Sequence, residues 1–273
     1  FEFFPTLSVS EQWTDNFNFT ATNHQTNYRT TVSPGGSFVI NGPTTRGVIS
    51  SSAGLTYDTA PSSSNFNVFP TITAALQQTF SPRLSLTLTD SYSRNNNPTY
   101  GDQFGLNRQR QDFTSNSFSA AITYLIDIVT TQAYYRNSLY YTGGSSNGNN
   151  TIFNVIGASA STQVGLYNTV TLGYEFSWSD TSGTSAGINS GKTTGNLVTA
   201  SVARQTGTYS SVGIQGSYQQ ATQPNEDDVH IWNVSLFSTY GFPSGLSLCT
   251  SLGVSQFEQG DQSSTGITSN SNL

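Results

Sequence analysis

The sequence predicts an all-β protein, an antiparallel up-and-down β-barrel that crosses a membrane with its strands. Three observations favour this fold class. Apolar and polar residues alternate with a period of two, short turns alternate with long polar loops, and aromatic residues gather near both ends of the predicted strands. A strand needs this pattern when lipid lies on one face and water lies on the other.

The alternation is clearest over residues 169–179. One face would carry Val170, Leu172, Tyr174, Phe176 and Trp178, and the other Thr169, Thr171, Gly173, Glu175, Ser177 and Ser179. Similar segments lie at 84–88, 118–126, 198–202, 212–218, 232–240 and 246–254, whereas 28–40 and 150–164 alternate poorly. Counted in this way, the chain holds about 13 strands.

Short turns and long loops follow one another along the chain. The short turns are expected at 41–43, 81–83, 127–128, 165–168, 207–210 and 243–245, and the long loops at 15–27, 59–65, 93–107, 143–150, 180–192 and 220–228. Short periplasmic turns opposite longer outer loops are typical of outer-membrane barrels. We interpret 258–273 as an outer loop without a returning strand. Residues 1–273 would then form one barrel domain that is incomplete at its C-terminus and part of a larger, even-stranded barrel.

Aromatic residues are predicted to form a girdle at each lipid–water interface. The residues near short turns are Phe80, Tyr167, Tyr209 and Phe242, and those nearer the loops are Trp13, Tyr57, Tyr92, Tyr141, Trp178, Tyr218 and Trp232. These two levels predict contact with outer-membrane lipid and lipopolysaccharide, and hence a location in the bacterial outer membrane.

Composition excludes several other classes. A net charge of -6 with nine Lys and Arg disfavours a nucleic-acid partner. The single cysteine, Cys249, cannot build a disulfide framework or a multi-cysteine zinc site, and no Cys-x-x-Cys-His is present, so no cofactor or metal is expected. The two histidines, His24 and His230, stand in no nucleophile motif, which predicts that the protein is not an enzyme. A soluble all-β sandwich remains the rival architecture.

If the apolar faces meet lipid, the opposite faces must line water. The predicted lining residues are Ser85, Thr87, Thr89, Thr123, Thr169, Thr171, Glu175, Ser177, Ser179, Ser247 and Ser251. Hydroxyl groups exchange hydrogen bonds with water or sugars without holding an ion strongly, which favours a neutral or carbohydrate solute. The alternative is that Ser and Thr only keep the bore wet and recognise nothing.

Several short segments resemble a known group of barrels. These are Pro5-Thr6-Leu7-Ser8-Val9-Ser10-Glu11 with Thr14-Asp15-Asn16, Ser33-Pro34-Gly35, residues 82–92, and Tyr135-Arg136. Together they resemble the outer-membrane β-barrel porins found beside exopolysaccharide and exosortase gene clusters, most strongly over residues 5–140. The resemblance implies a pore or polysaccharide-export channel, with a polysaccharide or a periplasmic export protein as partner, and it supplies no catalytic residue.

Three further interpretations stay open at this point. The barrel could be structural or adhesive instead of conducting, or it could form a sheath around a partner electron-transfer cytochrome. It could also associate as a homo-oligomer. The transported solute and any plug are not specified by these patterns.

Overall fold

The computed structural model describes residues 1–16, 24–60, 65–96, 112–143, 149–183, 191–223, 227–242 and 246–272. Within these residues the chain forms fourteen β-strands and no helix. The strands are β1 (Glu2–Thr14), β2 (Asn27–Asn41), β3 (Thr45–Asp58), β4 (Phe66–Ser81), β5 (Leu84–Asn95), β6 (Asp112–Ile126), β7 (Val129–Gly143), β8 (Asn149–Val164), β9 (Asn168–Gly183), β10 (Gly191–Gln205), β11 (Ser210–Thr222), β12 (Val229–Gly241), β13 (Ser247–Gln259) and β14 (Gln262–Asn272). No helix in this part of the chain is long and apolar enough to cross a membrane.

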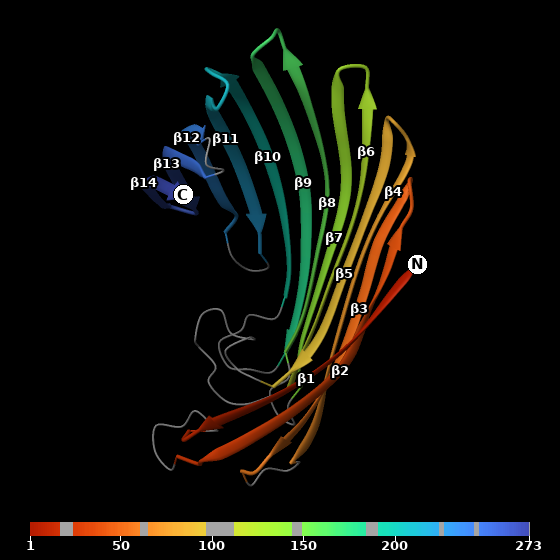
Figure 1. Ribbon diagram of the computed structural model, residues 1–273. Coiled ribbons are helices and arrows are strands. Elements are labelled where there is room, and N and C mark those ends of the chain that lie inside the picture. The colour runs from red at the N-terminus through yellow and green to blue at the C-terminus, as the bar shows by residue number, and fades with distance from the viewer. Residues whose placement is uncertain are drawn as a thin grey trace.

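The strands form one sheet whose spatial order equals their order in the sequence, from β1 to β14. Every neighbouring pair is antiparallel. The sheet curves around a concave interior, with β1 at one edge and β14 at the other (Figure 1). The predicted all-β, antiparallel, up-and-down architecture is therefore confirmed, in the form of an open barrel wall.

The strand count agrees with the expected number of about 13 to within one strand, but the predicted final loop is wrong. The structure has fourteen strands, and Gln262–Asn272 is a strand that pairs with β13 through the tight turn at Gly260 and Asp261. Gly260 has a φ of 55°, in the left-handed region that suits glycine. The alternation rule missed β14 because one face carries Ser263, Thr265, Ile267 and Ser269, with Ile267 as its one large apolar side chain.

The register places the apolar rows of separate strands on one face. Val202 lies opposite both Val170 and Ile214, and the row continues through Leu236 to Leu252. On β9 the side chains of this face are more exposed than those of the other, as expected where side chains splay outward on the convex side. Leu172 and Tyr174 are 57% and 47% exposed, whereas Glu175 and Ser177 between the apolar positions are half-buried.

A mostly apolar stretch runs along the convex face of β8, with Thr162 as its one polar residue. On β8 it extends from Val164 to Ile156, and the next convex-face residue, Asn154, accepts hydrogen bonds from Tyr135 and Asn137. This stretch of nine residues is similar in length to the roughly 9–11 residues of a transmembrane β-strand. On β8 the hydrogen-bonded polar cluster at Asn154 thus directly follows the apolar stretch that ends at Ile156.

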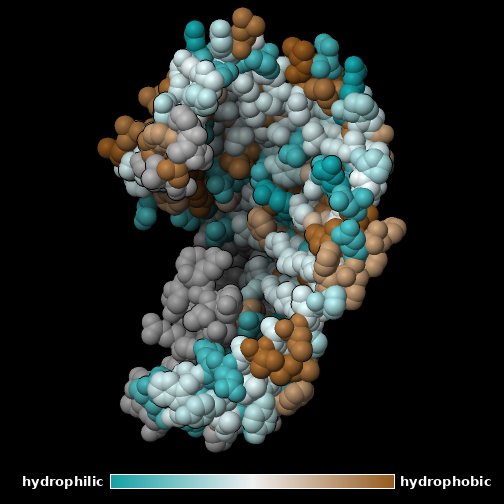
Figure 2. Space-filling model, viewed as in Figure 1, coloured by the Kyte–Doolittle hydropathy of each residue, from teal (hydrophilic) through white to brown (hydrophobic). Residues whose placement is uncertain are grey.

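The described residues form no dry core of the kind that a soluble sandwich needs. Among the described residues the buried hydrophobic side chains are Ala60, Phe113 and Val155, and no second sheet covers the apolar face. Figure 2 shows a hollowed side coloured mostly pale and teal, with brown patches toward the margins. A large exposed apolar surface of this kind marks a face that contacts either a membrane or another protein.

Candidate functional site

The structure places all the predicted lining residues on the concave face. The register places two of them directly opposite each other, Ser85 and Thr123. The complete set is Ser85, Thr87, Thr89, Thr123, Thr169, Thr171, Glu175, Ser177, Ser179, Ser247 and Ser251, and each belongs to this face. That the face lines a water-filled bore stays a prediction.

Hydroxyl groups on this face bond across neighbouring strands. Ser37 and Ser50 share a hydrogen bond of 2.8 Å, Ser93 and Ser115 one of 2.9 Å, and Ser161 and Thr171 one of 3.0 Å. Each hydroxyl oxygen can accept a second bond, so the pairs keep capacity for a solute.

The concave face has no net charge in the described strands. On β1–β3 it carries Glu2, Arg29, Arg46 and Asp58, and on β4–β14 its charged residues are Arg136 and Glu175. Three arginines therefore balance three carboxylates. Such a face attracts neither cations nor anions over a long range.

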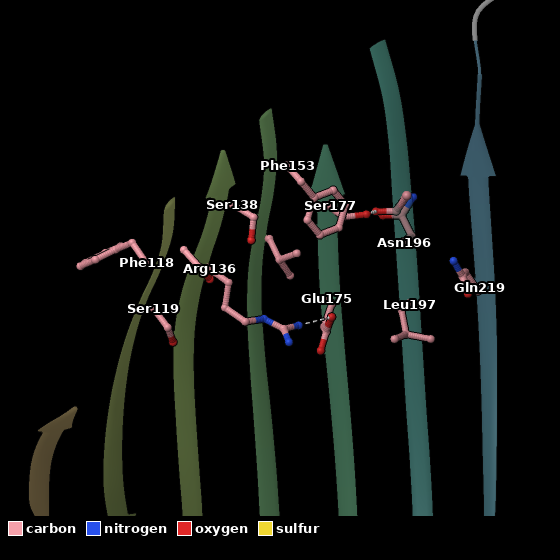
Figure 3. A pocket seen from close by; sticks show the side chains of 13 residues that line it. Phe118, Ser119, Arg136, Ser138, Phe153, Glu175, Ser177, Asn196, Leu197 and Gln219 are labelled. Atoms are coloured by element: carbon pink, nitrogen blue, oxygen red, sulfur yellow. Dashed lines mark hydrogen bonds and ion pairs between the residues drawn. The ribbon is translucent and has the colours of Figure 1, made fainter. Parts of the chain in front are cut away.

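Arg136 and Glu175 form an ion pair that spans three strands. The Arg136 Nη2 lies 2.8 Å from Glu175 Oε2, and the side chains are 49% and 27% exposed. Arg136 on β7 reaches over β8 to Glu175 on β9 (Figure 3). Val155, the β8 residue opposite Arg136, is only 3% exposed.

Tyr134 reaches the same carboxylate from the same strand. Its hydroxyl donates a hydrogen bond to Glu175 Oε1, and its ring lies 5.2 Å from the Arg136 guanidinium carbon. Tyr134, Gly157 and Glu175 are in register, so the ring must cross β8 at Gly157. A Cβ at Gly157 would lie 2.4 Å from the Tyr134 ring, so a side chain there would displace the tyrosine. The glycine is what allows the Tyr134–Glu175 contact.

A hollow of about 420 Å³ surrounds this cluster. Beside Arg136 and Glu175, its inward side chains are five polar groups, Ser117, Ser119, Ser138, Ser177 and Gln219, and three apolar groups, Phe153, Val155 and Leu197. Figure 3 shows Arg136 and Glu175 meeting within the hollow. The arrangement offers charged donors, charged acceptors and an apolar surface side by side.

A second ion pair is buried near the long-loop ends of β2 and β3. Asp58 accepts hydrogen bonds of 2.8 Å from Arg29 Nε and Nη2, and one of 2.7 Å from Asn27 Nδ2. Arg29 also donates to Asn96, just after β5. The Asp58 side chain is 1% exposed. This network ties the ends of three strands together and leaves Asp58 inaccessible to a large solute.

Most of the predicted girdle residues lie on the convex face or in the connections. On strands, the convex-face members are Trp13, Tyr57, Tyr92, Tyr141, Trp178, Tyr218 and Trp232, whereas Phe80 lies at an irregularity of β4 between Thr79 and Ser81. Tyr167 and Tyr209 lie in turns, and Phe242 directly follows β12. Tyr218 and Trp232 pack with ring centroids 4.1 Å apart. Their position at lipid–water interfaces stays a prediction.

The site residues that the sequence analysis did not single out are Tyr134, Arg136 and Gly157 for the hollow, and Arg29 with Asp58 for the buried pair. Arg136 had only a place in the family resemblance. A usable signal existed on β7, where Arg136 is the one charged residue on a face that otherwise carries Thr130, Gln132, Tyr134, Ser138, Tyr140 and Thr142. That both Tyr134 and Arg136 contact Glu175, however, depends on the register of β7, β8 and β9.

No family model and no curated protein matches this chain. Among solved structures, the chain is similar to a bacterial polysaccharide outer membrane secretin, with a TM-score of 0.48, 9% identity, and 97% of this chain and 95% of that chain covered. It also matches a mutant porin from Rh. blastica, with a TM-score of 0.23, 10% identity, and 97% and 98% covered. At these values any functional conclusion depends on the geometry of this chain itself.

Proposed function

We propose that this chain forms the wall of a bacterial outer-membrane channel that passes or exports neutral polar solutes, including saccharides. The observation that carries the proposal is the sidedness of one sheet: an exposed apolar convex face and a hydroxyl- and amide-rich concave face without net charge. The convex face suits acyl chains, and the girdle residues suit lipid and lipopolysaccharide headgroups. The concave face suits water and sugars.

The width of the wall supports passage instead of a filled interior. Barrels of about 8 strands are filled by side chains, whereas about 16–18 strands leave an aqueous channel. Fourteen strands that do not close on themselves lie toward the wide end of this range. Export of exopolysaccharide, with a periplasmic partner, is the specific form of this function that the sequence resemblance favours.

A channel of this kind should conduct with little ion selectivity. We expect the full chain, reconstituted in planar bilayers, to give discrete conductance steps with a cation-to-anion permeability ratio of about 1, because the concave face is neutral. Liposomes that contain it should swell in isotonic neutral oligosaccharide. The measurements are the reversal potential in a salt gradient and the swelling rate.

The same experiment separates the competing functions. Protein that is folded, by its heat-modifiable migration on gels, and yet neither conducts nor admits sugar would contradict the channel and favour a structural or adhesive barrel. Co-purification of a multihaem protein with a non-conducting barrel would favour the cytochrome sheath.

A further inference from the structure

We propose that the hollow at Arg136 and Glu175 is a binding subsite for a neutral saccharide segment that presents adjacent hydroxyl groups. This inference rests on the proposed channel function and specifies where along the wall a sugar would pause. The ion pair has unused hydrogen-bonding capacity, an apolar surface lies beside it, and its two charges balance.

The ion pair keeps donors and acceptors for a ligand. Glu175 accepts one bond on each oxygen, from Tyr134 and from Arg136, and each oxygen has a further lone pair. Arg136 has five N–H donors, of which one bonds Glu175. A hydroxyl that donates to Glu175 and a neighbouring hydroxyl that accepts from Arg136 would satisfy both, and adjacent hydroxyls of a pyranose ring have comparable spacing. Hydrogen bonds of this kind to charged groups are stronger than those between neutral groups.

The hollow also offers an apolar surface for the other side of a sugar ring. Phe153 on β8 is 42% exposed, and Leu197 on β10 lies opposite Glu175. Pyranose rings carry C–H groups that pack against aromatic and aliphatic side chains, while the hydroxyls at the rim reach Ser138 and Ser177. The volume of about 420 Å³ lies within the ordinary range of small-ligand sites, roughly 300–1,000 Å³.

The charges favour a neutral sugar over an acidic one. A uronate that approaches Arg136 would also meet the Glu175 carboxylate 2.8 Å from the guanidinium nitrogen, and like charges at that range repel. Cleavage is not expected, because glycoside hydrolysis ordinarily requires two carboxylates and Glu175 is the one acidic residue among the described residues that line the hollow. The hollow would therefore bind a neutral saccharide and release it unchanged.

Sugar block of the channel current tests the proposal. Maltohexaose is the neutral probe and oligogalacturonate the acidic one, each added to the full chain in a planar bilayer. We expect maltohexaose to interrupt the wild-type current with a half-blocking concentration well below that of oligogalacturonate. Glu175→Gln should raise that concentration for maltohexaose about tenfold, by loss of a charged hydrogen-bond partner. It should also lower the value for oligogalacturonate, because Arg136 is then uncompensated.

Two further variants keep the outcome interpretable. Gly157→Ala retains both charges but displaces Tyr134, and it should weaken maltohexaose block without changing ion selectivity. Ser201→Ala, on the concave face outside the hollow, is the matched control and should behave as wild type. Wild-type protein that does not conduct would overturn the channel itself. If the protein conducts but maltohexaose blocks the Glu175, Gly157 and Ser201 variants at the same concentration, the subsite alone would be overturned.

Discussion

Leu236→Arg is expected to lower the free energy of unfolding from a bilayer by about 2–4 kcal/mol, the cost of a basic side chain at the midplane of an outer-membrane barrel. Leu236 lies on the convex face of β12, 63% exposed, between the predicted girdle residues Trp232 and Phe242. If lipid covers this face, the guanidinium must enter hydrocarbon. The measurement is reversible unfolding from lipid vesicles in denaturant.

The adjacent residue supplies the control for this prediction. Ser235 precedes Leu236 on β12 and lies on the concave face, opposite Gln215 and Gly253. Ser235→Arg places the same charge on the face that we expect to contact water. It should therefore lower the free energy of unfolding clearly less than Leu236→Arg does. An equal loss of unfolding free energy in the two variants would mean that both faces have the same environment. That result would contradict a wall with lipid on one face and water on the other.

Asp58→Ala is expected to destabilise the protein by about 3–5 kcal/mol, because it removes one partner of a buried ion pair. Asp58 is 1% exposed, and its loss leaves the 12% exposed Arg29 side chain without the carboxylate that accepts both its Nε and its Nη2 bonds. Asn27 loses its Nδ2 acceptor at the same time. The measurement is the same unfolding experiment in vesicles.

The control for the buried pair is an exposed pair in the same protein. Arg94 and Asp112 form a salt bridge whose side chains are 47% and 39% exposed. Solvent screening limits such pairs to about 0–1 kcal/mol, so Asp112→Ala should change stability little. An Asp58→Ala effect as small as that of Asp112→Ala would show that the network at Asp58 does not hold the strand ends together.

Local periodicity was sufficient to predict most of the wall. On β9, each residue from Thr169 to Ser179 has the face that alternation assigns to it, because a strand's side chains change sides at every step. The signal fails where both faces are polar. For this reason β14 was missed, and β9 extends to Gly183 although residues beyond 179 were predicted to be loop.

The site required information that no single strand contains. Arg136 and Glu175 lie on strands separated by β8, and their contact depends on the register of two hairpins and on a glycine that leaves room for Tyr134. Arg29 and Asp58 likewise meet only because β2 and β3 pair in one particular register. Alternation gives the face of a residue but not its neighbour on the next strand, so the charged clusters could not be predicted from it.

Cysteine labelling across β9 tests the sidedness of the wall most directly. Single cysteines replace Thr171, Leu172, Tyr174 or Ser177 in a Cys249→Ser background, and the folded protein in lipid vesicles is treated with a membrane-impermeant maleimide. We expect labelling at 171 and 177 and protection at 172 and 174, although Leu172 and Tyr174 are the more exposed side chains when the sheet is considered without lipid. Rapid labelling at 172 and 174 would place water against the apolar face and contradict the membrane channel.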